Sequence, residues 1–331
     1  MAILVTGGAG YIGSHTVRML AEAGEQVVVV DTLELGHRDA LISPSVSFVQ
    51  ADLGDAAAMD AVFSSHPIEA VLHFAAYALV GESVSNPLKY YRNNLASPIT
   101  LLETMQRHNT RQFVFSSTCA TYGNPVRVPM DESHPQAPIN PYGMSKLMLE
   151  RVLIDCVNAC GINHVMLRYF NASGCSDDAA IGEDHEPESH LIPRALMAVT
   201  GEVPALTVFG NDYPTPDGTC IRDYIHVLDL AQAHADALSH LRKGGPSTAC
   251  NLGTGTGVSV LQMLKLVEEV TGKPVPFSFG PRREGDPPEL VADPSKAKAV
   301  LGWEAKWKDP RRMVESAWRW LSGPRGGRYP R

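Results

Sequence analysis

The first 31 residues constrain the fold more than any other stretch of the chain. An apolar run at residues 3–6 leads into the glycine-rich turn Gly7-Gly8-Ala9-Gly10-Tyr11-Ile12-Gly13. A helical pattern follows at residues 14–22, and a second apolar run at residues 27–30 ends in Asp31. This order predicts a β-α-β unit that carries a phosphate-binding turn.

The turn is suited to a dinucleotide. Glycines let the backbone approach a pyrophosphate closely, and the N–H groups at the start of the helix hold its negative charge. Asp31 can accept hydrogen bonds from both hydroxyls of a ribose, and its charge would repel the 2′-phosphate of NADP. Arg38, the nearest arginine downstream, lies too far along the loop to compensate. We therefore expect NAD. A glycine motif alone also fits an ordinary strand-to-helix turn, but the helix start and the acid rarely occur with it by chance.

The first half of the chain alternates strands with helices. Strands are expected at residues 46–49, 70–74, 112–115 and 164–167, and helices at 56–63, 87–108 and 142–160, with a loop through Gly81. Apolar strands joined by helices predict an α/β fold, a Rossmann-type doubly wound parallel sheet covered on both faces. Ligands bind beyond the carboxyl ends of such strands. The residues expected to line the cleft there are Asp31, Asp52, Phe74, Ser116 and Arg168.

Beyond residue 171 the elements become shorter, and prolines, glycines and acids become frequent. Strands are expected at residues 207–209 and 249–252, and helices at 227–241, 260–270 and 310–321, with Ser259 and Asp309 capping the last two. This change in composition and element length predicts an NAD-binding Rossmann domain at 1–170 and a smaller α/β substrate domain at 171–331. The helix at 227–241 is a candidate to fold back onto the first domain.

Two further segments resemble functional sites, but a structural interpretation fits each of them better. The glycine-rich segment 253–257 resembles a second phosphate loop, but a turn into the helix capped by Ser259 fits it better. The acidic segment Glu183-Asp184-His185-Glu186 suggests a metal site, but its proline neighbour and polar flanks fit a solvated loop better. We therefore expect no metal.

Composition narrows the class of partner and compartment. The 331 residues carry a formal net charge of −8, which disfavours a nucleic-acid partner because phosphate binding needs basic surface. No run approaches the ~18 apolar residues of a membrane span, so no membrane association is expected. The amino terminus enters the first strand without a basic segment or cleavage site, so we expect no signal peptide. The six scattered cysteines are typical of free thiols in a reducing cytoplasm.

Tyr142 and Lys146 carry the predicted chemistry. Their four-residue spacing places them on one face of a helix. A free phenol has a pKa of ~10, and a nearby ammonium favours its ionised form. The pair is therefore a candidate proton acceptor for an alcohol or sugar hydroxyl, although the spacing alone also fits a surface tyrosine beside a lysine. A hydroxyl of Ser116-Ser117-Thr118 can share the hydrogen bond of the reacting oxygen, unless these residues only cap a turn.

These motifs together resemble the extended short-chain dehydrogenase/reductase family. They are Thr6-Gly7-x-x-Gly10-x-x-Gly13, Ser116-Ser117-Thr118 and Tyr142-x-x-x-Lys146. Further segments are similar to the nucleotide-sugar 4-epimerases of that family, and the similarity runs nearly end to end. These segments are His73-Phe74-Ala75, Val80-Gly81-Glu82-Ser83-Val84, Arg168-Tyr169-Phe170-Asn171, Phe209-Gly210-Asn211-Asp212-Tyr213-Pro214-Thr215, Arg222-Asp223-Tyr224-Ile225-His226-Val227 and Arg282-Arg283-Glu284-Gly285-Asp286.

The resemblance implies an isomerase with a tightly held NAD that interconverts UDP-glucose and UDP-galactose. Tyr142 would take the proton from the sugar C4 hydroxyl while the C4 hydride passes to NAD. The 4-keto sugar would then turn its other face to the cofactor, and returning hydride would invert C4. The family resemblance also implies a homodimer formed through the helices that start at Pro87 and Tyr142.

The resemblance assigns residues to three groups. The catalytic group is Tyr142, Lys146 and Thr118. The cofactor group is Gly7, Gly10, Tyr11, Ile12, Gly13, Asp31, Asp52, Leu53, Phe74, Ala75, Asn93, Thr118, Tyr142, Lys146 and Phe170. The substrate group is Asn171, His190, Leu191, Phe209, Arg222, Arg283, Asp286 and Leu290. Two assignments stay open on sequence alone, because Asn93 also fits a structural helix asparagine and each arginine also fits an exposed surface charge.

Four positions depart from the pattern of many relatives. Ala78 stands where a loop lysine is common, Thr118 where serine is common, and His190 where asparagine is common. Leu290 replaces a wall residue that is often tyrosine when N-acetyl sugars are excluded, so turnover of UDP-N-acetyl sugars is an alternative activity. A nucleotide-sugar dehydratase is disfavoured because Cys119-Ala120, and not an acid pair, follows Thr118. A non-enzymatic NAD sensor is disfavoured because Tyr142 and Lys146 are both present.

Overall fold

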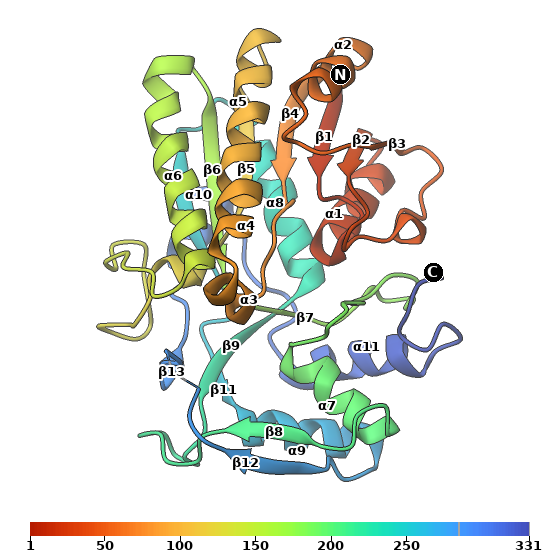
Figure 1. Cartoon of the computed structure of the whole chain (residues 1–331), viewed down its shortest axis with the longest axis vertical. Helices are drawn as coiled ribbons and strands as arrows, with labels where there is room; N and C mark the ends of the chain where they lie inside the picture. Colours follow the sequence, from red (N-terminus) through yellow and green to blue (C-terminus); the bar gives the residue numbers. More distant parts are fainter. Residues whose placement is uncertain (284, 331) are drawn as a thin grey trace.

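A seven-stranded parallel sheet forms the larger part of the molecule, in a computed structural model that describes residues 1–283 and 285–330 (Figure 1). Its strand order is β10-β6-β5-β4-β1-β2-β3, which is the order of a doubly wound sheet. The strands are β1 (Ala2–Thr6), β2 (Gln26–Asp31), β3 (Ser47–Gln50), β4 (Ile68–His73), β5 (Gln112–Thr118), β6 (Asn163–Tyr169) and β10 (Thr248–Leu252). The predicted Rossmann-type α/β class is confirmed.

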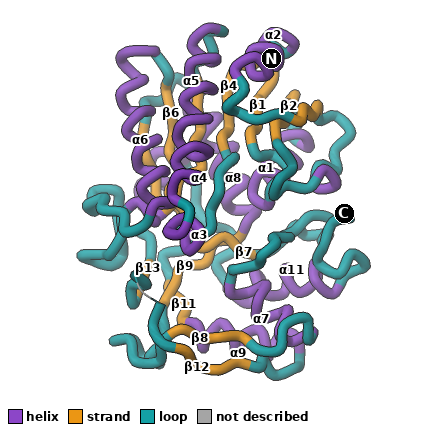
Figure 2. Tube along the Cα trace, in the orientation of Figure 1, coloured by secondary structure: helices purple, strands orange, loops and turns teal. Residues whose placement is uncertain are grey.

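Helices cover both faces of this sheet (Figure 2). Alternate residues of each strand point to opposite faces, so Ile3 and Val5 pack with Val17 and Leu230 while Leu4 packs with Met59. The first face is covered by α1 (Tyr11–Glu22), α8 (Val227–Arg242) and α10 (Ser295–Leu301). The second is covered by α2 (Ala56–Ser65), α5 (Ser97–Arg107) and α6 (Pro141–Cys160). Burial on both faces explains why the strands read as continuous apolar runs.

The segment expected as one helix over residues 87–108 is helical but not uniform. It comprises α4 (Pro87–Tyr91), a wide π-helical turn (Arg92–Ala96) and α5. Asn94 in the wide turn is buried, and its side chain accepts from the N–H of Tyr77 and donates to the carbonyl of Tyr77 and to Ser145. The loop expected through Gly81 is present but ends at Leu79, where the short helix α3 (Val80–Ser85) begins. The wide turn therefore ties the loop after β4 to α6.

A smaller unit lies beside the carboxyl ends of the large sheet (Figure 1). One of its sheets contains β7 (Asn171–Ser173), β9 (Ile221–His226), β11 (Gly257–Ser259) and β13 (Glu289–Leu290), and another pairs β8 (Leu206–Phe209) with β12 (Phe277–Gly280). Its helices are α7 (Leu191–Thr200), α9 (Val260–Thr271) and α11 (Pro310–Ser322). Ser259 and Asp309 cap α9 and α11 as predicted, since their side chains accept from Gln262 N–H and Arg311 N–H.

The chain passes between the two units more than once. Helix α8 packs on α1, β5 and β6, and β10 pairs with β6 as an edge strand of the large sheet. The proposed boundary at residue 170 therefore stays a prediction. None of the helices in the described residues is long and apolar enough to cross a membrane.

The side chain of Arg168 does not line the cleft, and that expectation is wrong. Arg168 lies on the same sheet face as Met166, toward α6, because strand residues alternate between faces. Its guanidinium makes two hydrogen bonds, of 2.9 and 2.7 Å, with the carboxylate of Glu150. Both side chains are buried, and Ser117 donates a further hydrogen bond of 2.6 Å to Glu150. Arg168 is thus a structural cation between β6 and α6.

Candidate active site

A cavity of about 570 Å³ opens at the carboxyl ends of β1, β2, β4, β5 and β6. Every residue assigned to the cofactor lines it, although those residues are spread from position 7 to position 170 in the sequence. They are Gly7, Gly10, Tyr11, Ile12, Gly13, Asp31, Asp52, Leu53, Phe74, Ala75, Asn93, Thr118, Tyr142, Lys146 and Phe170. The fold therefore brings the predicted set to one place.

The glycine turn leaves no space for side chains at two positions. A Cβ on Gly7, which has φ of +69°, would lie 2.5 Å from the backbone N of Ala75. A Cβ on Gly13 would lie 2.2 Å from the carbonyl oxygen of Gly7. The turn consequently packs directly against the end of β4 and exposes the start of α1 to the cavity. Backbone N–H groups at a helix start suit the pyrophosphate of NAD, so the residues present fit this cofactor.

Asp31 has a structural role beside the predicted one. Its Oδ2 accepts the N–H of Ala9 at 3.0 Å and its Oδ1 accepts the N–H of Leu33 at 2.9 Å. Burial raises the pKa of this carboxyl, and the two N–H groups oppose that rise. A carboxylate offers about four acceptor sites, so Asp31 can hold the turn and still accept from ribose hydroxyls.

The start of α6 places Tyr142 and Lys146 in the cavity wall. Asn140 caps the helix by accepting the N–H of Gly143 at 2.9 Å, and Pro141 begins it. Tyr142 is 9% exposed and Lys146 is 3% exposed. The Nζ of Lys146 donates to the carbonyl of Ser116 at 2.9 Å. The helix thus presents the phenol to the cavity, while the amine also ties α6 to β5.

The three hydroxyls that end β5 have different partners. Ser116 shares a hydrogen bond of 2.8 Å with the hydroxyl of Tyr169, and Ser117 donates to the buried Glu150. Thr118 lines the cavity, and its hydrogen bond with Tyr142 lowers the pKa of the phenol. Thr118 is therefore the hydroxyl placed to share a hydrogen bond with Tyr142.

Burial acts on both members of the predicted catalytic pair. It raises the pKa of Tyr142, and the hydroxyl of Thr118 opposes this rise. Burial also lowers the pKa of Lys146 to about 7, against a weaker opposing effect of Glu150. The loss of hydration at both groups thus works against ionisation of the phenol, and the expected effect of Lys146 on Tyr142 stays a prediction.

Asn93 lines the cavity but does not contact Lys146 through any hydrogen bond of the described residues. Its amide donates to Oδ1 of Asn94 at 2.9 Å. Asn93 is therefore a candidate cofactor contact whose orientation is set by its buried neighbour. Sequence reasoning missed Asn94, because nothing in the sequence distinguishes the two adjacent asparagines.

The substrate group is divided by the structure. Six of its members line the cavity, and two do not. The six are Asn171, His190, Arg222, Arg283, Asp286 and Leu290. Phe209 lies beneath the Arg283 guanidinium, 4.5 Å from carbon to ring centroid, and Leu191 packs into the core of the smaller unit. Glu284, between two of these positions, lies outside the described residues.

Arg222 is partly engaged by the protein itself. Its Nη1 donates to the carbonyls of Ile221 and Pro287 at 2.8 and 2.9 Å, and its Nη2 lies 3.5 Å from Asp286. The neighbouring Asp223 is buried and accepts the N–H groups of Thr254 and Gly255. Those N–H groups are thus occupied, in agreement with the interpretation of segment 253–257 as a structural turn.

Several cavity residues were not predicted. Tyr77 donates its hydroxyl to the carboxylate of Glu34, which links the loops after β4 and β2 beside the cavity. Ala78 lines the cavity where the common lysine would stand. Glu183 and His185 also line it, and the side chain of Glu183 is only 7% exposed. The expectation of a solvated loop at residues 183–186 is therefore wrong for Glu183, because its side chain is buried in the cavity wall.

Comparisons with known proteins place these features in a family context. Residues 3–253 match the model of the NAD dependent epimerase/dehydratase family. The chain is 52% identical to a UDP-glucose 4-epimerase of Halalkalibacterium halodurans, over 97% of this chain and 95% of the relative. It is also 52% identical to one of Streptococcus mutans, over 98% of each chain. A crystal structure of UDP-glucose 4-epimerase from Brucella ovis in complex with NAD superposes with a TM-score of 0.93, at 48% identity over 96% of this chain and 97% of that one.

Replacing Lys146 by methionine should stabilise the cofactor-free protein. The pKa of Lys146 is about 7 in the folded state, against 10.5 for an unperturbed lysine, so the unfolded state binds more protons between these values and wild-type stability rises with pH across that window. We expect Lys146→Met to raise the free energy of unfolding at pH 6 by about 1–3 kcal/mol, and by less at pH 9.

Urea unfolding at the two pH values measures this difference. Lys265→Met, on the solvent side of α9, serves as the control and should change little at either pH. A destabilised Lys146→Met protein at pH 6, or a gain that is larger at pH 9, would contradict the expected effect of burial on this amine.

Proposed function

The chain belongs to the NAD dependent epimerase/dehydratase family, and from this premise we propose how it interconverts UDP-glucose and UDP-galactose as an NAD-dependent isomerase. One observation supports the proposal most directly. Tyr142 and Thr118 open into the same cavity as the glycine turn, in a chain that matches UDP-glucose 4-epimerases over nearly its full length. A nucleotide-binding turn and an acid–base hydroxyl pair therefore face one space.

Tyr142 is the proposed proton acceptor for the C4 hydroxyl of the sugar. NAD, when bound, would supply the acceptor and donor of the C4 hydride. The buried phenol needs a positive environment to ionise, and Thr118 can donate a hydrogen bond to the phenolate oxygen. Lys146 has a pKa near neutrality, so it can take up or release a proton beside the phenol at physiological pH.

The residues on the other side of the cavity are proposed to hold the UDP part. Arg222 and Arg283 bring planar guanidinium groups that suit a diphosphate. Asn171, His190 and Asp286 can bond polar groups of the nucleotide, and Leu290 forms an apolar wall. Phe209 supports Arg283 from below, and Leu191 would act through its backbone at the start of α7. A firm hold on UDP leaves the 4-keto sugar free to turn.

The alternatives within the family are weaker. A dehydratase needs acids beside Thr118, and the residues there, Cys119 and Ala120, line the cavity without supplying a carboxylate. Burial raises the pKa of the Cys119 thiol to about 12, so it is a poor acid or base at neutral pH. An NAD sensor would not need Tyr142 and Lys146 at the cavity wall.

A cytoplasmic location is part of the proposal. All six cysteines lie in the described residues and are free, which is the usual state of thiols in a reducing compartment.

Tyr142→Phe should retain NAD and the fold but lose at least ~100-fold in turnover, because the proton acceptor is removed. The measurement is conversion of UDP-galactose to UDP-glucose by purified protein without added NAD. Tyr91→Phe is the matched control, since Tyr91 lies on α4 away from the cavity lining and should turn over normally. Near-normal rates for Tyr142→Phe would remove this residue from the mechanism, and a 4-keto-6-deoxy product from the wild type would indicate a dehydratase.

Turnover of UDP-N-acetylglucosamine is the second activity that the cavity supports. Leu290 is a wall residue, packed beside Tyr122, Met130 and Phe170, and it leaves more space than a tyrosine. We expect detectable turnover by the wild type and a loss of ~10-fold or more in Leu290→Tyr, with smaller change for UDP-glucose. Turnover of the N-acetyl sugar below detection in the wild type would reject this activity.

A homodimer through α4, α5 and α6 is also proposed. Leu88, Ile99, Met148 and Ile154 expose apolar side chains on these helices, as expected of an interface. Light scattering should give about twice the chain mass, and Ile154→Glu with Met148→Glu should shift it toward the monomer. A monomer mass for the wild type would contradict the proposal.

A further inference from the structure

Four side chains of one segment gather beside the cavity, and only one of them, His190, is assigned to the substrate. Glu183, His185, Glu188 and His190, which we call the Glu–His cluster, each present one potential ligand atom, and these atoms lie within 4.8 Å of one another. Glu183 and Glu188 are 7% and 5% exposed. The cluster ends at the start of α7, where His190 is the residue before the helix.

Both histidines direct the same nitrogen toward both carboxylates. The Nδ1 of His190 lies 2.7 Å from Oε1 of Glu183 and 3.1 Å from Oε1 of Glu188. The Nδ1 of His185 lies 3.2 Å from Oε1 of Glu183 and 3.7 Å from Oε2 of Glu188. One potential ligand atom from each of the four side chains can therefore be directed toward a shared point between them.

One of these atoms is buried without a hydrogen bond. Oε1 of Glu183 finds no donor in suitable geometry among the described residues, although both Nδ1 atoms approach it. Glu188 differs, because its Oε1 accepts the backbone N–H groups of Ser189 and His190 at 2.7 Å each. A buried carboxylate oxygen without a donor is costly, and a cation at the shared point would satisfy it.

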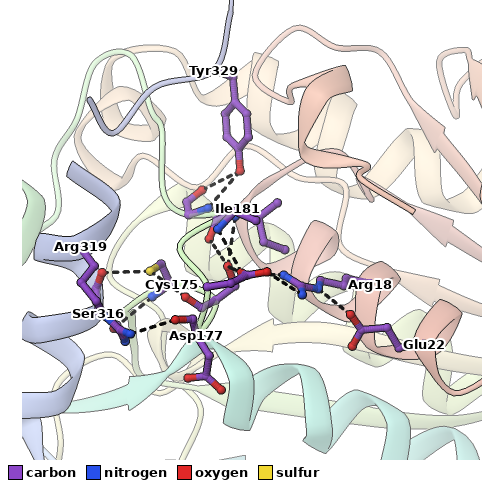
Figure 3. A network of polar contacts seen from close by, with 12 residues as sticks. Arg18, Glu22, Cys175, Asp177, Ile181, Ser316, Arg319 and Tyr329 are labelled. Carbon is purple, nitrogen blue, oxygen red and sulfur yellow. Dashed lines mark hydrogen bonds and ion pairs between the residues drawn. The ribbon is translucent and has the colours of Figure 1, made fainter. Parts of the chain in front are cut away.

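The backbone before the cluster is held from three elements (Figure 3). Arg18 of α1 makes two bonds, of 2.8 and 2.9 Å, with Asp178, and Arg319 of α11 donates to the carbonyl of Asp177 at 2.9 Å. The Tyr329 hydroxyl accepts the N–H of Gly182 at 3.0 Å. Trp320 donates to the carbonyl of Glu183 at 2.8 Å. The backbone of the first ligand residue is consequently held in place before any ion arrives, which favours a defined site.

We propose that Glu183, His185, Glu188 and His190 bind a divalent transition-metal ion of the zinc class. Two imidazoles and two carboxylates form a nitrogen and oxygen donor set that suits Zn²⁺ and its neighbours better than Mg²⁺ or Ca²⁺, which prefer all-oxygen sites. The two carboxylates also balance the charge of the ion.

The spacing of the donors agrees with this class of ion. Zinc bonds of ~2.0–2.2 Å in a tetrahedron separate neighbouring donors by ~3.3–3.5 Å. The four distances from Nδ1 to carboxylate oxygens given above run from 2.7 to 3.7 Å, and the four candidate ligand atoms all lie within 4.8 Å of one another, so side-chain rotations that even out these separations would complete the site. Since Glu183, His185 and His190 line the cavity, the ion would fix this part of its wall. Its role is structural, and the epimerase chemistry proceeds without it.

The test uses the untagged full chain with its cofactor, purified without chelator, so that a histidine tag does not contribute. Metal content is measured by mass spectrometry, and chelator-treated protein is then titrated with Zn²⁺, with Co²⁺ and, for comparison, with Mg²⁺. We expect about one Zn²⁺ per chain and a rise of several degrees in melting temperature at saturation. Co²⁺ should give the visible absorption of a four-coordinate site with nitrogen and oxygen ligands, and Mg²⁺ should give none of these effects.

Variants assign the ion to the cluster. Glu183→Gln and His185→Gln should each weaken Zn²⁺ binding by at least ~10-fold, and Glu188→Gln provides a further variant if one of these fails to fold. Matched controls are Glu315→Gln on the exposed side of α11 and His66→Gln after α2, which should bind as the wild type does. X-ray absorption on the wild type should show two imidazoles among the ligands.

Three results would overturn the proposal: no stoichiometric Zn²⁺ binding by the wild type, binding unchanged in the cluster variants, or a ligand set with sulfur or without imidazole. In each of these cases the cluster is an ion-pair network of charged histidines. Because the readouts are metal content, melting temperature and spectra, they do not depend on whether the chain turns over UDP-sugars.

Discussion

The contact between the glycine turn and the end of β4 determines where everything else in the site lies. Gly7 and Gly13 have no room for a Cβ, since backbone atoms of Ala75 and of Gly7 itself stand at 2.5 and 2.2 Å from where one would be. This contact brings the start of α1 against the sheet and leaves its N–H groups facing the cavity. Asp31 then holds the turn by accepting from Ala9. Because the strands pair in parallel, the carboxyl ends of the other strands lie at the same edge of the sheet.

Burial both enables and opposes the proposed chemistry. Tyr142 and Lys146 lose hydration, so the pKa of the phenol rises and that of the amine falls to about 7. Without cofactor, the phenol of Tyr142 is therefore neutral near pH 7, and the amine of Lys146 is only partly charged. A positive cofactor ring next to the phenol would reverse the balance for Tyr142.

The sequence was sufficient for the parts of the fold that depend on local periodicity. The β-α-β unit and the helix caps Ser259 and Asp309 formed as predicted, and the residues assigned to the cofactor all line one cavity. Side-chain direction at strand ends was not predictable. Arg168 precedes Tyr169, which lines the cavity, and its side chain points to the other side of the sheet. A strand that is buried on both faces shows no alternation of polar and apolar residues, so its sequence does not indicate which side chains face the cavity.

Features that depend on contacts between distant segments could not be predicted from the sequence either. The Tyr77 hydroxyl donates a hydrogen bond to Glu34, which lies 43 residues away in the sequence. Asn94 donates to the hydroxyl of Ser145 because the wide turn brings the two side chains together. The segment Glu183-Asp184-His185-Glu186 fitted a solvated loop because of its proline neighbour and polar flanks. Its backbone is held by Trp320 and Tyr329, which lie far along the chain and bond the carbonyl of Glu183 and the N–H of Gly182.

Electrostatics connects the cluster to the rest of the site. The chain has a net charge of −8, yet its cavity must accept two diphosphates, one from the cofactor and one from the substrate. The helix start, Arg222 and Arg283 supply local positive potential. Two unpaired carboxylates at Glu183 and Glu188 would oppose it from the same wall. The cluster must therefore be neutral or positive when substrate binds, and either charged histidines or a divalent ion meets that condition.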